Sequence, residues 1–303
     1  MPLHIETPLL ESRPLAVHAG RSVWLKMDAL QPSGSFKLRG IGAACEAHAR
    51  RGARCFISSS GGNAGIAAAH AGRRLGIPVQ VVVPETTSAR TLELLRLEDA
   101  RVIVHGASWQ EANELARSML GEHDAFLHPF DDPLVWEGHA TLVDEVARSG
   151  LRPDAVVLSV GGGGLLAGVV AGLRRNGWDQ LPVIAAETEG AASLAGSLAA
   201  GERITLAAID SIATSLGAKQ VCEQAFRVAR EHPLKSVVVS DRAAARACLR
   251  FLDEQRVLVE PACGAALAVA YDGHPALADY RTVLMVVCGG VTATLEQLQG
   301  WVG

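Results

Sequence analysis

The chain has 303 residues, of which 49% are hydrophobic and 4% aromatic, and its formal net charge is −4. This length suits two domains or one large α/β domain. The near-neutral charge, without a long basic or acidic block, gives nucleic-acid binding little electrostatic support, so we expect no nucleic-acid partner.

The six cysteines are scattered, and none forms a C-x-x-C pair or a Cys/His cluster with zinc spacing. Met1–Leu10 lacks the basic start and apolar core of a secretory signal. Scattered thiols are typical of a reducing compartment, so the predicted location is the cytoplasm. Val156–Leu173 carries no charge, but it contains Gly161 to Gly164. Each glycine costs a helix interior about 1 kcal/mol relative to alanine, which favours a strand, a glycine turn and a helix over a membrane span.

From residue 54 onward, short β-rich runs alternate with longer runs rich in Ala and Leu. In chain order, the predicted elements are a helix near Phe36 capped by Ser35, strand 54–59, helix 63–75, strand 78–83, helix 88–97, strand 101–104, helix 108–122, strand 155–160, helix 165–175, strands 183–187 and 237–240, helix 241–255 and strand 282–288. Near-continuous apolar strands such as Val79–Val83 are typical of parallel sheets buried on both faces. The alternation predicts a doubly wound α/β architecture, with Phe130–Pro133 as the clearest crossing between two lobes.

Three predicted strands run into turns that contain glycine: Ser58–Gly65, Val160–Leu165 and Cys288–Gly290. Ligands of open α/β sheets collect at the carboxyl ends of strands, so these turns are candidates for one site. Gly161, Gly162, Gly163 and Gly164 open a helix, where unpaired N–H groups and the helix dipole favour a phosphate. The run matches neither a Walker A loop nor G-x-G-x-x-G, and a tight strand–helix turn is the alternative.

Ser60, Gly61, Gly62 and Asn63 precede another predicted helix, whose N-terminus suits a small carboxylate. Simple N-capping by Ser or Asn is the alternative interpretation. Lys37 follows the turn Pro32–Ser35 and is placed in a first helical turn beside Phe36. The helix dipole and burial both lower the pKa of a lysine there, as a nucleophile requires, although most lysines are solvated surface residues.

Pro32–Gly40 resembles the Schiff-base lysine motif of fold-type II enzymes that use pyridoxal 5′-phosphate (PLP). Ser60–Asn63 resembles the substrate-carboxylate loop of these enzymes, Gly161–Gly164 their phosphate cradle, and Cys288–Gly290 the strand end beside the pyridine nitrogen. The resemblance implies two open, mostly parallel twisted sheets with flanking helices, in a large domain (1–40 and 136–303) and a small domain (41–135). It implies PLP contacts from Phe36, Lys37, Asn63, Gly161, Gly162, Gly163, Gly164, Leu165 and Cys288, and a homodimer.

Within the family, the segments Phe130–Leu134, Trp136–Ala140 and Val259–Ala266 are similar to the L-serine dehydratase/L-threonine deaminase branch. The resemblance implies deamination of L-serine to pyruvate and ammonia, and of L-threonine to 2-oxobutanoate and ammonia, with Ser60, Gly61, Gly62 and Asn63 binding the substrate carboxylate. Gly61 stands where racemases and cysteine synthases have a serine, which argues against racemisation and replacement. Cys288 implies a neutral partner for the pyridine nitrogen, which suits β-elimination.

The same resemblance implies a cation site formed by Gly161, Glu187, Ala191, Ser193, Leu216 and Ala218. One carboxylate with carbonyl oxygens suits a monovalent ion such as K⁺ better than Mg²⁺. The alternative is that Glu187 only caps a strand end. His139 departs from the commoner residue of the family and is interpreted as structural.

Three rival functions stay open at this point. They are a β-replacement enzyme of the cysteine synthase type, a PLP-binding protein without catalytic activity, and a nucleotide-binding protein.

Overall fold

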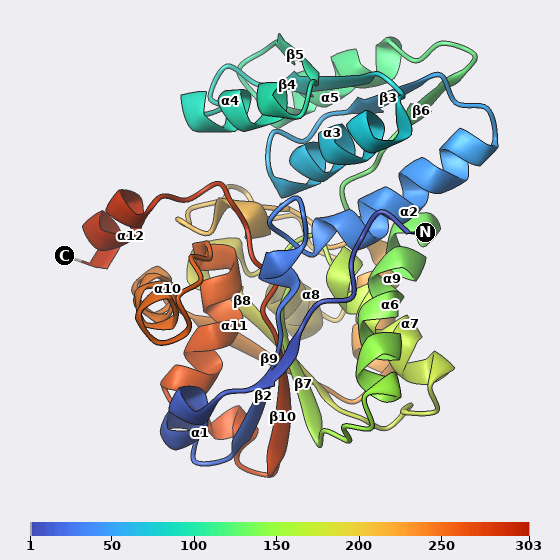
Figure 1. Cartoon of the computed structure of the whole chain (residues 1–303). Helices are drawn as coiled ribbons and strands as arrows, with labels where there is room; N and C mark the ends of the chain where they lie inside the picture. Colours follow the sequence, from blue (N-terminus) through green and yellow to red (C-terminus); the bar gives the residue numbers. More distant parts are fainter. Residues whose placement is uncertain (1, 303) are drawn as a thin grey trace.

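The computed structural model describes residues 2–302, which form two lobes, each built on its own sheet (Figure 1). The large lobe contains a six-stranded sheet with the spatial order β1-β2-β10-β7-β8-β9. Its strands are β1 (Leu9–Glu11), β2 (Ser22–Lys26), β7 (Ala155–Ser159), β8 (Val183–Thr188), β9 (Leu234–Val239) and β10 (Thr282–Val286). All neighbouring strands are parallel except β1 and β2, which pair antiparallel.

The small lobe contains a four-stranded parallel sheet with the order β5-β4-β3-β6. Its strands are β3 (Cys55–Ser58), β4 (Val79–Val83), β5 (Arg101–Val104) and β6 (Asp124–Phe126). Alternate residues of these strands enter separate cores, because successive side chains point to opposite faces. Phe56 and Val81 belong to one core, whereas Ile57 and Val82 belong to the other. Two open, mostly parallel sheets were predicted, and the structure confirms them.

Helices cover both faces of each sheet. In the large lobe, α1, α10 and α11 lie on one side and α6, α7 and α9 on the other (Figure 1). In the small lobe, α3 packs on one face of the strands and α5 on the other. The helices are α1 (Arg13–Ala19), α2 (Lys37–Arg50), α3 (Asn63–Leu75), α4 (Ala89–Leu97), α5 (Trp109–Ser118), α6 (Pro133–Arg148), α7 (Gly164–Arg175), α8 (Ser193–Ala200), α9 (Glu223–Glu231), α10 (Asp241–Gln255), α11 (Pro261–Tyr271) and α12 (Leu295–Val302), with short 3₁₀ turns η1 (Asp28–Leu30), η2 (Glu189–Ala191), η3 (Thr214–Leu216) and η4 (Pro275–Leu277).

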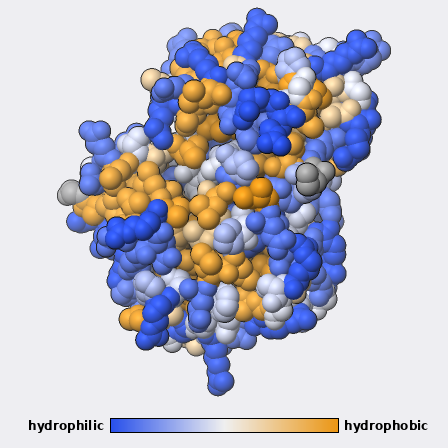
Figure 2. All heavy atoms as spheres, in the orientation of Figure 1, coloured by the Kyte–Doolittle hydropathy of each residue, from blue (hydrophilic) through white to orange (hydrophobic). Residues whose placement is uncertain are grey.

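Two long helices join the lobes. Helix α2 packs against α3 of the small lobe and against α6 of the large lobe. Both α2 and α6 run across the predicted domain limits near residues 40 and 135, so those limits stay a prediction. In the space-filling view, the outline narrows between the lobes, and apolar side chains gather beside the C-terminal end (Figure 2).

Val156–Leu173 forms nearly all of β7, a glycine turn and most of α7, as the sequence predicted. Across residues 2–302, every helix is too short or too polar to span a bilayer. The predicted cap at Ser35 is wrong, because Phe36 is the N-cap residue of α2. Ser35 is instead held by a β-bridge to Gly289, and its hydroxyl finds no hydrogen-bond partner within residues 2–302.

Candidate active site

A cavity of about 820 Å³ lies between the lobes, at the carboxyl ends of β3, β7 and β10. The three predicted glycine turns meet in its wall, together with the start of α2. The predicted site residues that line it are Phe36, Lys37, Ser60, Gly61, Gly62, Asn63, Gly161, Gly162, Gly163, Gly164, Leu165, Leu216, Ala218 and Cys288. Glu187, Ala191 and Ser193 lie outside this lining.

Lys37 is the first residue of α2, and its side chain reaches into the cavity. Its Nζ donates a hydrogen bond of 2.6 Å to the carbonyl oxygen of Pro129 and lies 5.1 Å from the centre of the Phe36 ring. Burial lowers the pKa of Lys37 from 10.5 to about 8, although the nearby Glu260 carboxylate opposes the shift. A large fraction of Lys37 is therefore the neutral amine at weakly alkaline pH, the form that acts as nucleophile and base.

Gly161 to Gly163 lie in the turn between β7 and α7, and Gly164 is the first residue of α7. The structure gives each of the four glycines a packing reason: a Cβ would lie 2.8 Å from Leu216 Cα at Gly161, 2.3 Å from the Phe130 ring at Gly162, 2.3 Å from Ala225 at Gly163 and 2.7 Å from the Phe130 carbonyl oxygen at Gly164. The number of glycines alone therefore does not identify a phosphate site. The hydrogen bonds do support one, because within residues 2–302 the N–H groups from Gly161 to Leu165 donate to no backbone acceptor outside the helix.

The turn Ser60–Asn63 leads from β3 into α3. Gly62 is the N-cap residue, and no side chain of the described chain caps this helix, so the N-capping alternative is wrong for Ser60 and Asn63. The N–H groups of Gly61, Gly62 and Asn63 have no backbone acceptor within residues 2–302 and are available to a carboxylate.

Cys288 lines the cavity two residues after β10, and its carbonyl oxygen accepts a hydrogen bond of 3.0 Å from the N–H of Phe36. A hydrogen bond with Cys263 and burial both raise the pKa of the Cys288 thiol well above its usual value. The sulfur is therefore protonated at neutral pH and presents a neutral group to the cavity.

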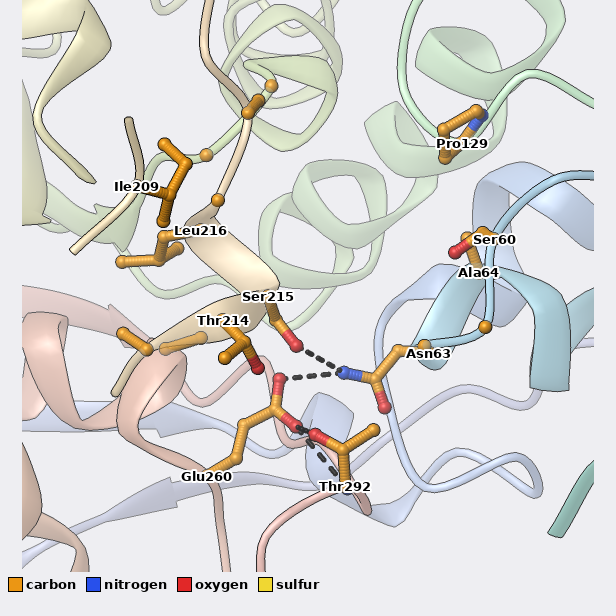
Figure 3. Close-up of a pocket in the computed structure, with 18 of the residues that line it drawn as sticks. Ser60, Asn63, Ala64, Pro129, Ile209, Thr214, Ser215, Leu216, Glu260 and Thr292 are labelled. Carbon is orange, nitrogen blue, oxygen red and sulfur yellow. Dashed lines mark hydrogen bonds between the residues drawn. The ribbon is translucent and has the colours of Figure 1, made fainter. Parts of the chain in front are cut away.

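Glu260 is a residue of this site that the sequence reasoning did not single out. It lines the cavity and is 3% exposed. Its carboxylate accepts hydrogen bonds from Asn63 Nδ2 (2.7 Å) and Thr292 Oγ1 (2.5 Å) (Figure 3). A single acid directly before the apolar helix α11 (PACGAALAVAY) was the available signal.

A buried ionic cluster contacts the first turn of α2. The Arg39 guanidinium is fully buried and binds two carboxylates, Asp28 at 2.8 and 2.9 Å and Glu145 at 2.5 and 2.7 Å. Lys26 forms a further ion pair with Glu145. Arg39 makes two hydrogen bonds to each carboxylate and lies two residues after Lys37. It thereby fixes the first turn of α2 in place.

Glu187 lies in β8 and is completely buried. Its two oxygens accept hydrogen bonds of 2.8 Å from the N–H groups of Leu194 and Ala195, at the start of α8. It therefore binds a helix N-terminus instead of capping a strand end. Burial raises the pKa of Glu187 to about 7, although the hydrogen bonds from the Leu194 and Ala195 N–H groups oppose the shift. No salt bridge to Glu187 occurs among residues 2–302.

His139 packs its ring 4.9 Å from that of Phe36, and both ring nitrogens lack partners among the described residues. Burial lowers the pKa of His139 well below 6.5. A neutral imidazole outside the cavity lining supports the packing role inferred from the sequence.

The cavity fits a flat phosphate-bearing cofactor attached to lysine. Three groups line the same cavity: the Lys37 amine with its lowered pKa, the unpaired N–H groups of Gly161–Leu165, and the protonated thiol of Cys288. The unpaired N–H groups of Gly61–Asn63 leave room beside it for a substrate carboxylate.

Comparisons with known proteins agree with this geometry. The family model "Pyridoxal-phosphate dependent enzyme" matches residues 1–289. The chain is 47% identical to an L-serine dehydratase/L-threonine deaminase of Mus musculus, with 98% of this chain and 94% of the relative covered. It is 50% identical, over the same shares, to a serine dehydratase-like protein of Rattus norvegicus. Its fold is similar to that of an L-serine ammonia-lyase from Rhizomucor miehei, with a TM-score of 0.94, 34% identity and coverage of 99% and 98%.

Proposed function

This chain belongs to the family of pyridoxal-phosphate dependent enzymes, and on that premise we propose that it deaminates L-serine to pyruvate and ammonia, and L-threonine to 2-oxobutanoate and ammonia. The observation that carries the proposal is Lys37. Its amine has a pKa of about 8 and lies in one cavity with two sets of unpaired N–H groups, one for a phosphate and one for a carboxylate.

When bound, PLP supplies an electron sink for the negative charge that develops at the substrate Cα. Lys37 would hold it covalently, and the N–H groups of Gly161–Leu165 would hold its phosphate. Phe36 would pack beside its ring, Asn63 would hydrogen-bond its phenolic oxygen, and Cys288 would face its pyridine nitrogen. A protonated thiol leaves that nitrogen uncharged, which suits elimination.

The chain's own residues then bind the substrate and move one proton. The N–H groups of Gly61, Gly62 and Asn63 bind the carboxylate and thereby orient the Cα–H bond. Lys37, free once the substrate amine has replaced its own, takes the α-proton as the neutral amine. Loss of that proton and of the β-hydroxyl, together one water, leaves 2-aminoacrylate, whose hydrolysis gives pyruvate and ammonia. Threonine follows the same course with one additional methyl group.

Gly61 supports elimination over racemisation. A racemase needs a proton donor on the face of the substrate opposite the lysine, and glycine has no side chain to donate one. A Cβ at Gly61 would lie 3.1 Å from Val83 Cγ1 and 3.2 Å from Thr87 Cγ2, so these two side chains would have to move by a few tenths of an ångström to admit one.

We also propose a monovalent cation such as K⁺ at Glu187, with Ser193 and with carbonyl groups of Gly161, Ala191, Leu216 and Ala218. Three features support it: Glu187 is a buried acid without a cation partner in the described chain, the buried Ser193 hydroxyl has no hydrogen-bond partner there, and Gly161 packs directly on Leu216. The homodimer and the domain limits stay predictions from the resemblance, and the cytoplasmic location stays a prediction from the scattered cysteines.

The test is product formation from L-serine, D-serine and L-threonine by protein loaded with PLP. We expect pyruvate from L-serine and 2-oxobutanoate from L-threonine, with D-serine a poor substrate. A cysteine synthase would instead form cysteine from O-acetylserine and sulfide. A PLP-binding protein without activity would give a coloured protein and no product with any of these substrates.

A further inference from the structure

Glu260 is a charged group of the cavity that the steps above leave without a role. It precedes α11, and its side chain extends from the large lobe toward Asn63, at the start of α3 in the small lobe (Figure 3). One oxygen accepts the 2.7 Å hydrogen bond from Asn63 Nδ2. The other accepts from the hydroxyl of Thr292 at 2.5 Å and from its N–H at 3.4 Å. Glu260 therefore joins three chain segments at the edge of the cavity.

The Glu260 side chain is buried among neutral groups and packs directly on Gly290. All its donors are neutral, and no ion pair to Glu260 occurs within residues 2–302. A Cβ at Gly290 would lie 2.0 Å from Glu260 Cδ, so residue 290 must be glycine, and its φ of 113° also requires one. Burying a carboxylate without a cation is costly. An apolar residue would fill this space at a lower cost if packing were the only requirement.

The hydrogen bonds of the Asn63 side chain indicate the role of Glu260. Asn63 Oδ1 accepts a hydrogen bond from the N–H of Val291 (3.2 Å), while Nδ2 donates to Glu260 and lies 3.4 Å from Ser215 Oγ. An amide can rotate by a half turn and exchange its oxygen and nitrogen. Glu260 permits only one of these orientations, because a carboxylate accepts hydrogen bonds and cannot bind the amide oxygen.

We infer that Glu260 is a positioning residue: its hydrogen bond to Asn63 Nδ2 fixes the side-chain orientation of Asn63 toward the cofactor and holds the Ser60–Asn63 loop against the large lobe. The inference rests on the proposed function, because Asn63 acquires its role only with PLP in the cavity. What matters for this role is the reach of an acceptor oxygen to Asn63, and not the negative charge.

Two substitutions separate reach from charge. Glu260→Gln keeps the length and one acceptor oxygen but removes the charge, and its NH₂ can donate to Thr292 Oγ1. Glu260→Asp keeps the charge but is one methylene too short to reach Asn63. The measurements are the visible absorbance and circular dichroism of bound PLP, the PLP affinity, and kcat and KM for L-serine.

We expect Glu260→Gln to stay within about threefold of the wild type, with an unchanged absorbance maximum. We expect Glu260→Asp and Glu260→Ala to lower kcat/KM by about 10- to 100-fold, the range for an unpaired buried polar group, and to change the circular dichroism of the cofactor. Asn63→Ala combined with Glu260→Asp should be no worse than Asn63→Ala alone, because Glu260 acts through Asn63. Glu254→Ala is the matched control, since Glu254 accepts a hydrogen bond from Tyr271 far from the cavity lining.

The opposite pattern, with Glu260→Asp near the wild type and Glu260→Gln impaired, would overturn the inference and assign the role to the charge. Additive losses in the Asn63/Glu260 double variant would also overturn it. In both cases the wild type still binds PLP and forms pyruvate, so the proposed function stands. A wild type that forms no visible cofactor band and no pyruvate would overturn the proposed function, and the inference with it.

Discussion

Lys37 Nζ and the carbonyl oxygen of Pro129 lie 2.6 Å apart, which joins the start of α2 to the segment that follows β6. This hydrogen bond holds the amine inside the cavity, where burial lowers its pKa to about 8. The neutral amine therefore predominates above about pH 8, whereas an ordinary lysine reaches this state near 10.5.

The attachment rate of PLP to cofactor-free protein should follow this titration. Only the neutral amine attacks the aldehyde, so the rate should rise with pH and reach half its maximum near pH 8. Stopped-flow absorbance at a series of pH values measures it. A midpoint near the ordinary lysine value would show that Lys37 is not desolvated as described.

Substitution of Gly162 by alanine should weaken PLP binding and lower stability. The new Cβ would lie 2.3 Å from the Phe130 ring, so the ring or the cradle must move. Overpacking of this kind costs about 1–3 kcal/mol. Thermal unfolding and PLP titration measure the two effects. Gly300→Ala is the control, because a Cβ there meets no atom within 4 Å, and equal behaviour of both variants would argue against the described cradle.

Gly61→Ser should reduce kcat/KM for L-serine several-fold, because the added Cβ would lie 3.1 Å from Val83 and 3.2 Å from Thr87. Adding Thr87→Ser removes the crowding Thr87 methyl and should restore part of the activity. Pyruvate formation and chiral analysis of the remaining serine measure both variants. If the double variant has no higher kcat/KM than Gly61→Ser, crowding by Thr87 does not cause the loss of activity.

Arg39→Ala should destabilise the fold by about 3–5 kcal/mol, because it leaves Asp28 and Glu145 buried without their main partner. Arg148→Ala removes an ion pair with Glu6 in which both side chains are mostly exposed, and should cost no more than about 1 kcal/mol. Urea unfolding of the two variants measures the difference. Similar losses would mean that the buried cluster does not fix α2.

Potassium should raise the unfolding temperature of the wild type more than sodium or a bulky organic cation at equal ionic strength. An ion that fits the site at Glu187 binds the folded protein and thereby stabilises it. Glu187→Gln should abolish the difference between the cations. Equal stabilisation of both proteins by K⁺ would count against a cation at Glu187.

Much of the fold could be predicted from the sequence, because its strands are short apolar runs separated by glycine turns. Helices α3 and α10 begin and end at the predicted residues. β1 and β6 were missed because each has three residues, too few for a periodic pattern. Helix α11 was missed because it is buried on every side, so no alternation of polar and apolar residues marks it.

The cavity lining was predictable where the chain itself carries the signal, as at Lys37 and in the glycine turns. Glu260 and Thr292 lie far from Asn63 in sequence and meet it only through the packing of the two lobes. Arg39 was visible in the sequence, but its partners Asp28 and Glu145 come from η1 and α6. Contacts of this kind follow from tertiary structure and not from local pattern.

The most direct test compares the wild type with Lys37→Ala, both purified with added PLP, by visible absorbance after gel filtration and by pyruvate formation from L-serine. We expect a visible band and pyruvate for the wild type, and neither for Lys37→Ala. A Lys37→Ala variant that keeps both the band and the turnover would contradict the assignment of Lys37 and, with it, the proposed function.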